Sequence, residues 1–213
     1  MAHTSNAEQK AWRDFQSAES LTDEQQKQFQ TYAHLLAEWN KRINLTAINT
    51  IPDIITRHFR DSLSIRPFLP GKPLAVADVG TGAGFPGIPI KIIRPDVTLI
   101  LIEVNNKKIA FLQKVVNILR LENVHIFTQD WRTFVRSTDY SIDFFFARAS
   151  LAPQELVRIF RSDGPYARAT LVYFASQHWK PDEASAVWMR GEEKYVIAGT
   201  PRRLIFFSGD RAA

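Results

Sequence analysis

The sequence predicts an α/β fold in which helices cover both faces of a mostly parallel sheet and an N-terminal helical cap precedes the sheet. Short apolar runs alternate with helical patterns from residue 74 onward, as in successive βαβ units. A glycine-rich stretch directly follows the first of these runs. The residues before it show helical patterns only, and segment 67–73 has the proline and glycine content of a linker. We therefore expect a cap over residues 1–70 and a sheet domain over 71–213.

Composition excludes several classes of site. The 213 residues are 45% hydrophobic and 12% aromatic, enough for a sizeable core. A formal charge of +5 fits a nucleic-acid partner without requiring one. Because the chain has no cysteine, it has no disulfide, no thiolate nucleophile and no cysteine-ligated zinc. Its five histidines are widely spaced, so we expect no metal site.

The N-terminal sequence shows no targeting signal. The first twelve residues are polar and lack the apolar run of a signal peptide, and no apolar segment approaches the ~20 residues of a membrane span. We expect a cytoplasmic protein that has no membrane partner and acts as a monomer.

The cap is predicted to contain two helices. Thr22 is a suitable N-cap, with acidic residues in the turn that follows it, and this helix is expected to end near Asn40. Its apolar side chains recur at helical intervals and are expected to pack in the core, namely Phe29, Tyr32, Ala33, Leu36 and Trp39. A connector at 44–48 leads to a second helix over 51–65.

The second helix carries three basic side chains with two possible roles. Arg57 and Asp61 are one turn apart, and a solvated ion pair is the ordinary explanation for them. Alternatively, Arg57, His58 and Arg60 face the mouth of the glycine-rich loop and contact phosphates.

The sheet domain is predicted element by element from its periodicity. Strands are expected at 74–79, 98–103, 123–128, 142–147 and 170–175, with further candidates at 194–198 and 203–208. Helices are expected at 86–94, 106–121, 131–137 and 152–162. In parallel sheets, ligands bind beyond the carboxyl ends of the strands, where strand order reverses. The glycine-rich stretch lies at such an end.

The glycine-rich loop predicts a small-molecule site. Asp78 ends the first strand, and Gly80, Gly82 and Gly84 follow it, so backbone can approach a ligand closely. Gly82, Gly84 and Gly87 formally match the dinucleotide fingerprint G-x-G-x-x-G. However, an acid followed by G-x-G-x-G resembles the first motif of class I S-adenosylmethionine-dependent methyltransferases. A P-loop is excluded because no Gly-Lys-Ser/Thr follows.

Two acidic residues after later strands fit a nucleoside ligand. Glu103 lies 19 residues after Gly84, at the end of the second strand, where a carboxylate can accept from both ribose hydroxyls. The alternative is an ordinary ion pair with Lys107 or Lys108. Asp130 follows the third strand and is placed to meet the adenine amino group. Trp131 beside it either covers the adenine ring or packs in the core.

Several strings together resemble one family of proteins. They are NLTAI (44–48), RHFRDSLS (57–64), DVGTGAGFPGIP (78–89), KKIAFLQ (107–113) and ARA (147–149). In this order and spacing they resemble the RsmG (GidB) family, bacterial enzymes that use S-adenosylmethionine to methylate N7 of a guanine in the 530 loop of 16S rRNA (position 527 in the family). The resemblance implies a Rossmann-like class I methyltransferase fold, S-adenosylmethionine as cofactor, and 16S rRNA or a small-subunit ribosomal particle as partner.

The resemblance also implies roles for individual residues. Gly80 and Phe85 line the cofactor site, and the backbone at Trp131 and Arg132 meets the adenine. Arg148 lies at the reacting centre, where it contacts the cofactor and is the catalytic candidate. The RNA-binding candidates are Asn44, Arg57, His58 and Arg60.

The sequence departs from the family pattern at two places. The family has Arg-x-Glu after the third strand, whereas this chain has Asp130, Trp131 and Arg132. The family also has Leu-Lys-Gly near the end of the fifth strand, where residues 173–176 here are Tyr-Phe-Ala-Ser. Either Arg148 or Lys180 compensates for the missing lysine near Phe174, or the chain is a divergent relative with a changed substrate.

The expected chemistry needs few side chains. Guanine N7 has a free lone pair and no proton, so catalysis depends on alignment and needs no general base. Arg148 can donate to the O6 and N7 edge of guanine, or it is held in a salt bridge to Asp143 or Asp78. The alternatives to an rRNA methyltransferase are a non-catalytic RNA-binding assembly protein with the same fold and a small-molecule methyltransferase.

Overall fold

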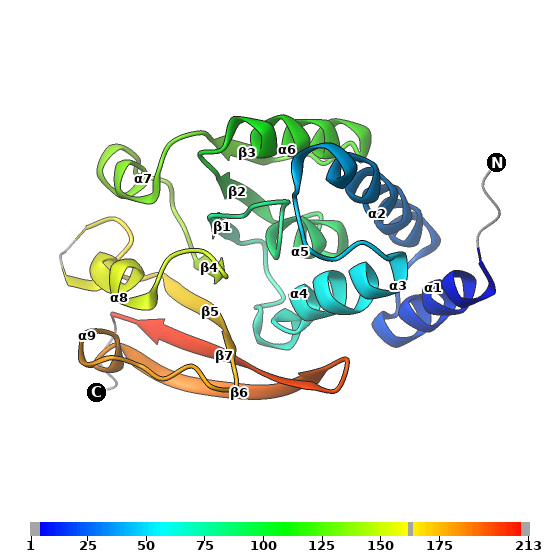
Figure 1. The fold of residues 1–213 in the computed structure, drawn as a ribbon. Helices are drawn as coiled ribbons and strands as arrows, with labels where there is room; N and C mark the ends of the chain where they lie inside the picture. The colour runs from blue at the N-terminus through cyan, green and yellow to red at the C-terminus, as the bar shows by residue number, and fades with distance from the viewer. Residues whose placement is uncertain (1–4, 162–163, 210–213) are drawn as a thin grey trace.

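A seven-stranded sheet forms the centre of the computed structural model, which describes residues 5–161 and 164–209 (Figure 1). The strands are β1 (Ala75–Val79), β2 (Thr98–Ile102), β3 (Val124–Phe127), β4 (Phe144–Arg148), β5 (Thr170–Ser176), β6 (Met189–Ile197) and β7 (Thr200–Ser208). Their order is β3-β2-β1-β4-β5-β7-β6, and β7 runs antiparallel to both of its neighbours. The predicted, mostly parallel sheet is confirmed.

Strand order reverses at β1. The chain moves outward from β1 to β2 and β3, and then crosses back to place β4 on the other side of β1. Val79, the last residue of β1, is paired with Ile102 of β2 and with Ala147 of β4. The crevice for a ligand in such a sheet opens at this switch point, directly above the glycine-rich loop.

Helices cover both faces of the sheet, as predicted (Figure 1). They are α5 (Gly87–Ile93), α6 (Asn106–Ile118), α7 (Trp131–Ser137), α8 (Pro153–Leu156) and α9 (Glu183–Ala186). A 3₁₀ turn, η3 (Val157–Arg161), continues α8, and the last residue of the predicted helix 152–162 lies outside the described residues. One apolar cluster contains the cap, α5 and α6, and the other contains α7, α8 and η3.

The cap begins with α1 (Asn6–Glu19), which the periodicity did not predict because its inward face holds few large apolar side chains, chiefly Trp12 and Phe15. The helix α2 (Asp23–Ile43) starts with the predicted cap at Thr22, which forms a capping box with Gln25. It continues past the expected end near Asn40, and Asn44 closes it in the left-handed conformation, with φ of 45°.

The predicted helix over 51–65 contains an irregular turn. It consists of α3 (Ile51–Ile54), a π-helical turn η1 (Ile55–Arg60) and α4 (Asp61–Leu63), followed by the 3₁₀ turn η2 (Arg66–Phe68). Periodicity cannot reveal a π turn, and such turns are frequent at functional sites. Here it carries His58 and Phe59 into the interior.

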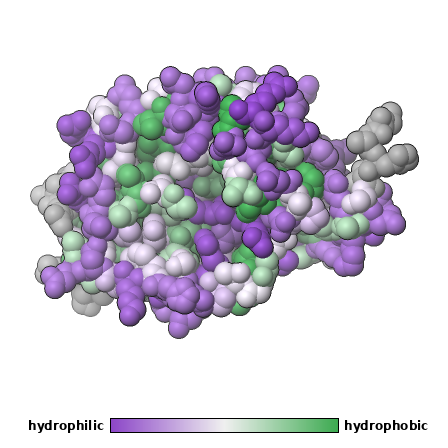
Figure 2. All heavy atoms as spheres, in the orientation of Figure 1, coloured by the Kyte–Doolittle hydropathy of each residue, from purple (hydrophilic) through white to green (hydrophobic). Residues whose placement is uncertain are grey.

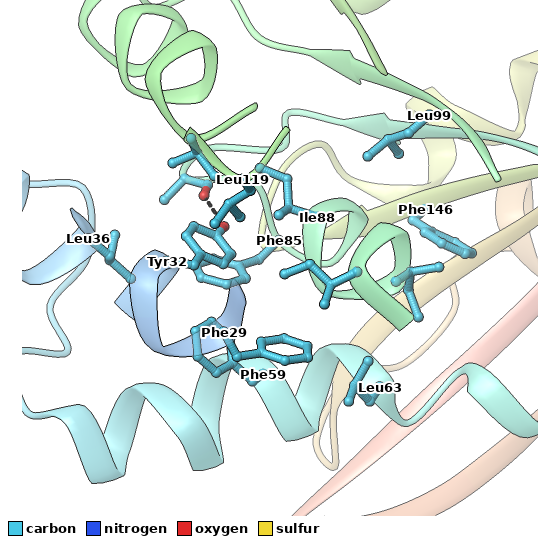
Figure 3. Close-up of a cluster of buried hydrophobic side chains, with 14 of the residues drawn as sticks. Phe29, Tyr32, Leu36, Phe59, Leu63, Phe85, Ile88, Leu99, Leu119 and Phe146 are labelled. Atoms are coloured by element: carbon cyan, nitrogen blue, oxygen red, sulfur yellow. Dashed lines mark hydrogen bonds between the residues drawn. The ribbon is translucent and has the colours of Figure 1, made fainter. Parts of the chain in front are cut away.

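The cap and the sheet share one core (Figure 3). Phe29 and Tyr32 of α2 pack against Phe59 of η1, and Tyr32 also stacks on Phe85 beyond the glycine loop. The aromatic stripe on α2 is therefore core, as predicted. Segment 67–73 joins two parts that are packed together, and the division at residue 70 remains a prediction.

The C-terminal hairpin is longer than the predicted strands 194–198 and 203–208. β6 and β7 contain nine residues each and meet at Ala198 and Gly199, both with positive φ, as in a two-residue hairpin turn. β6 forms the edge of the sheet and is largely polar, so its first half gave no alternating pattern.

Figure 2 shows hydrophilic side chains over most of one face, with apolar residues in small patches. No helix within residues 5–161 and 164–209 has the length and apolar character needed to cross a membrane. The same residues contain no cluster of three or more His, Asp or Glu side chains that could hold a metal ion.

Candidate cofactor and substrate site

Asp78 stabilises the conformation of the glycine loop through hydrogen bonds to residues within and after it. Its carboxylate is fully buried, and Oδ2 accepts hydrogen bonds from the Thr81 hydroxyl at 2.7 Å and the Gly87 N–H at 2.8 Å. The other oxygen, Oδ1, is buried without a hydrogen-bond partner in the described part of the chain. Burial raises the pKa of Asp78 to about 6.

Two of the loop glycines are required by close neighbours. Gly80 has φ of +63°, and a Cβ there would lie 2.7 Å from the Cβ of Ser150 after β4. Gly84 has φ of +98°, and a Cβ there would lie 2.5 Å from Ile88 and 2.7 Å from the Tyr32 hydroxyl. The loop therefore packs against both the end of β4 and helix α2 of the cap.

A cavity of about 580 Å³ opens where β1 and β2 end. Its lining consists of Val79, Gly80, Ile102, Glu103, Val104, Asp130, Trp131, Arg132, Leu151, Ala152, Gln154 and Glu155. The structure thus brings five of the predicted cofactor residues to one cavity: Gly80, Glu103, Asp130, Trp131 and Arg132. The others are not in this lining: Asp78, Gly82, Gly84, Phe85 and Arg148.

Glu103 is held by backbone donors. It is buried, with Oε2 accepting from the Gly82 N–H at 3.0 Å and Oε1 accepting from Val104 at 3.0 Å and Asn105 at 2.9 Å. Among the described residues, no ion pair joins it to Lys107 or Lys108, so that alternative is wrong. Each carboxylate oxygen has two lone pairs, and three of the four are used, which leaves one acceptor position on Oε2.

The residues after β3 serve structural roles at the cavity wall. Asp130 is the N-cap of α7, and its Oδ1 accepts from the Thr133 N–H at 2.7 Å. Trp131 is buried edge-on against Phe145, so its ring belongs to the core. Arg132 is exposed and forms an ion pair of 2.7 Å with Glu155. What these residues offer a ligand is therefore mostly backbone and apolar surface.

A second, smaller cavity of about 210 Å³ has three arginines among its seven lining residues, and we call it the arginine-lined cavity. Its lining consists of Ile48, Arg57, Asp61, Arg148, Ile197, Thr200 and Arg202. Arg148 directly follows Ala147, which is paired with Val79 of the first cavity. The two cavities thus lie at the carboxyl ends of adjacent strands, β1 and β4.

Arg148 is bound through several donors. Its Nε lies 2.9 Å from Asp61 Oδ2, and Nη2 donates to the Arg57 carbonyl at 2.8 Å and to His58 Nδ1 at 3.1 Å. The two ion pairs expected from the sequence, Arg57 with Asp61 and Arg148 with Asp143 or Asp78, are therefore both wrong. Asp61 holds Arg148 in place of Asp143 or Asp78, and Arg57 lies beside Asp53, at 3.4 Å, because the π turn rotates Asp61 inward.

His58 is a neutral, interior residue. Because a guanidinium only donates, Nδ1 must accept from Arg148, and the ring proton is assigned to Nε2, which donates to the Thr46 hydroxyl at 2.8 Å. Burial, with Arg148 nearby, lowers the pKa of His58 to about 3. The ring stacks on Phe85, with centroids 4.4 Å apart and an interplanar angle of 12°.

The remaining RNA-binding candidates lie at the surface of the cap. Asn44 is exposed at the end of α2. The Arg57 side chain is 58% exposed, and Arg60 is 45% exposed and pairs with Glu19 at 3.4 Å. His58 differs from them, since it is buried and uncharged.

Two charged residues of the arginine-lined cavity, Asp61 and Arg202, were not predicted as site residues. Asp61 is almost fully buried and accepts from the Tyr195 hydroxyl at 2.8 Å. Arg202 approaches Asp61 to 3.5 Å from β7. In the β5–β7 ladder Arg202 is paired with Ser176, so it lies beside the strand end where the family's lysine is missing. No local pattern connects positions so far apart in the chain.

Solved methyltransferase structures share this fold. A SAM-dependent methyltransferase from Aquifex aeolicus matches with a TM-score of 0.55 and 16% identity, over 73% of this chain and 93% of that one. TrmK of M. capricolum, solved with S-adenosyl-homocysteine, matches with a TM-score of 0.55 and 14% identity, over 70% of this chain and 68% of that one. At such identity the match establishes the fold, a Rossmann-like methyltransferase sheet.

Proteins similar in sequence identify a narrower family than the structural matches do. Ribosomal RNA small subunit methyltransferase G of Streptococcus agalactiae is 46% identical over 110 residues, which are 51% of this chain and 46% of that protein. The enzyme of the same name from Streptococcus pyogenes is 44% identical over an equal span. The match thus covers about half the length of these relatives. The model of the GidB family, described as rRNA small subunit methyltransferase G, matches residues 25–173, and the chain belongs to this family.

Proposed function

We propose that the chain is an S-adenosylmethionine-dependent methyltransferase that acts on N7 of a guanine in the 530 loop of 16S rRNA. One observation carries the proposal: an acceptor-bearing cavity and an arginine-lined cavity lie at the ends of the paired strands β1 and β4. Such an arrangement suits a nucleoside cofactor beside a polar, anionic substrate. The choice of small-subunit rRNA as the substrate in this proposal comes from the names of the relatives.

The first cavity fits the chemistry of S-adenosylmethionine. Its volume lies within the roughly 300–1,000 Å³ of small-molecule sites. Val104 and Leu151 are exposed apolar side chains at its wall and suit a planar base. Glu103, which lines the cavity, retains an acceptor position on Oε2 for a ribose hydroxyl. When bound, the cofactor supplies an electrophilic methyl group on its sulfonium.

The residues of the second cavity position a nucleophile and transfer no proton. Guanine N7 needs no base, and a His58 that is neutral near pH 7 agrees with a reaction that requires none. The Nη2 group of Arg148 donates to Arg57 and His58, and its Nε forms an ion pair with Asp61. The two N–H donors on Nη1 have no partner in the described part of the chain. They are available for guanine O6 while N7 stays free.

The RNA backbone is proposed to cross the cap next to this cavity. Arg57 and Arg60 are exposed and can meet phosphates, and Asn44 offers an amide at the end of α2. Binding of this kind weakens steeply with salt. We propose that the partner is 16S rRNA or a small-subunit particle, and that the protein is cytoplasmic and acts as a monomer.

A changed RNA substrate is the second candidate, favoured by the end of β5. Residues 173–176 contain no lysine near Phe174, where the family has one, so this cation is absent from its usual strand. Arg202 offers a charge at the neighbouring position of β7. An altered target predicts methyl transfer to rRNA outside the 530 loop.

Radiolabel transfer tests the proposal. The protein is incubated with labelled S-adenosylmethionine and either naked 16S rRNA or small-subunit particles from a strain that lacks the N7 methyl group. We expect label in at least one of the two substrates and none in the same substrate from a methylated strain. Binding of S-adenosylhomocysteine without transfer to either substrate would support a non-catalytic RNA-binding role.

A further inference from the structure

Tyr32 connects the N-terminal cap to the glycine loop. It lies in α2, is fully buried, and donates its hydroxyl hydrogen bond to the carbonyl of Ala83 between the second and third loop glycines (Figure 3). Burial raises the pKa of the Tyr32 hydroxyl well above its ordinary value, so it stays a protonated donor. A residue far from the loop in sequence thereby holds one of the loop's carbonyls in place.

The Tyr32 side chain also packs closely against the same loop. It stacks on Phe85, with centroids 5.3 Å apart and an interplanar angle of 23°. On the loop side, any Cβ at Gly84 would lie 2.7 Å from the Tyr32 hydroxyl. The glycine and the tyrosine are therefore matched, since the loop can follow its path only because position 84 leaves room for this hydroxyl.

The stack continues toward the arginine-lined cavity. Phe85 has Tyr32 as one neighbour and His58 as another, and the guanidinium of Arg148 lies 5.7 Å from its ring centroid. A packed aromatic series thus runs from α2, past the cofactor loop, to the residue that is proposed to hold the guanine.

We propose that Tyr32 is a positioning residue for the cofactor loop, which makes the cap a part of the cofactor site as well as a surface for RNA. The inference rests on the proposed function in so far as the loop binds S-adenosylmethionine. Without the hydroxyl, the carbonyl of Ala83 loses its buried donor and the loop populates other conformations. A ligand then binds only the fraction of molecules in the competent conformation, and its apparent affinity falls by that fraction.

The chain offers a matched control in Tyr166. It is equally buried, its hydroxyl lies 2.6 Å from the Thr138 hydroxyl, and its ring stacks on Phe134 at 5.5 Å and 22°. It belongs to the apolar cluster on the opposite face of the sheet and has no contact with the glycine loop. Tyr32→Phe and Tyr166→Phe therefore remove the same atom from similar surroundings.

The experiment compares both variants with the wild type by calorimetry with S-adenosylhomocysteine and by hydrogen exchange of the loop amides. For Tyr32→Phe we expect a dissociation constant higher by roughly three- to tenfold, the worth of one hydrogen bond. Exchange of the Gly84 and Phe85 amides, both bonded to the Thr81 carbonyl, should also be faster. For Tyr166→Phe we expect less than a twofold change in affinity and unchanged exchange in the loop.

Two outcomes overturn the inference. One is an unchanged affinity and unchanged loop exchange in Tyr32→Phe, and the other is an equal loss in both variants, which would indicate a general effect of stability. Failure of the wild type to bind S-adenosylhomocysteine would instead contradict the proposed function. In that case the exchange of the loop amides still decides whether Tyr32 positions the loop.

Discussion

Replacing Asp61 with asparagine removes the carboxylate that pairs with Arg148 and Arg202 in the arginine-lined cavity. The Asp61 side chain is 3% exposed and that of Arg148 is 14% exposed, and their ion pair of 2.9 Å is largely shielded from water. Arg202 is more exposed, at 27%, and lies farther away, at 3.5 Å. Asparagine keeps an acceptor for the Tyr195 hydroxyl, so the charge is the main loss.

The expected loss in the free energy of unfolding follows from the burial of this ion pair. Removing one partner of a buried ion pair leaves the other charge uncompensated and costs about 3–5 kcal/mol of the free energy of unfolding. The more exposed pair with Arg202 adds at most about 1 kcal/mol. For a chain of this length each kcal/mol lowers the melting temperature by roughly 2–4 °C, so we expect Asp61→Asn to lower it by about 6–24 °C.

Urea denaturation followed by circular dichroism at pH 7 measures the effect. Asp53→Asn is the matched control, because it breaks the exposed pair with Arg57 and is expected to cost less than about 0.5 kcal/mol. In a double-mutant cycle, Asp61→Asn combined with Arg148→Met should cost less than the sum of the single changes by about 1–3 kcal/mol. The reasoning is refuted if Asp61→Asn costs no more than Asp53→Asn.

Three further predictions concern the loop, the cofactor and the RNA. Burial raises the pKa of Asp78 from 3.8 to about 6, so ionising it costs more in the folded state, and stability should fall by about 2 kcal/mol as pH rises from 4 to 7. This loss should vanish in Asp78→Asn, and an unchanged pH profile would contradict the assigned pKa. Glu103→Gln replaces one carboxylate oxygen with an amide donor, which then faces at least one of the backbone N–H groups that Glu103 binds, and calorimetry should show at least roughly tenfold weaker binding of S-adenosylhomocysteine; equal affinity would remove Glu103 from the site. Arg57→Ala with Arg60→Ala should reduce the salt dependence of rRNA binding by a log–log slope of about 1.4–1.8 without altering cofactor affinity, and an unchanged slope would place the RNA elsewhere.

The fold could be predicted because its signals are local. Each buried strand of the parallel part is a short apolar run, and each helix beside it carries its own periodicity. The glycine loop was equally visible, since Asp78 and three glycines are contiguous in sequence. Glu103 was found by its distance from that loop. These features need no knowledge of how distant segments meet.

The substrate side could not be predicted for the same physical reason. Asp61, Arg148 and Arg202 come from the cap, from β4 and from the C-terminal hairpin, and only tertiary packing brings them to one cavity. Helical spacing suggested Arg57 as the partner of Asp61, but the π turn, which periodicity does not reveal, turns Asp61 inward. Tyr32 was correctly placed in the core, whereas its hydrogen bond to the cofactor loop emerged only from the structure.

Mapping the methyl group on 16S rRNA tests the central claim most directly. Unmethylated small-subunit particles or naked 16S rRNA are treated with the protein and S-adenosylmethionine, and the nuclease fragments are analysed by mass spectrometry. We predict one added methyl group, on N7 of a guanine within the 530 loop, together with its loss in Glu103→Gln. A methyl group elsewhere in the rRNA, or an unmodified 530 loop despite measured cofactor binding, would contradict the proposed function.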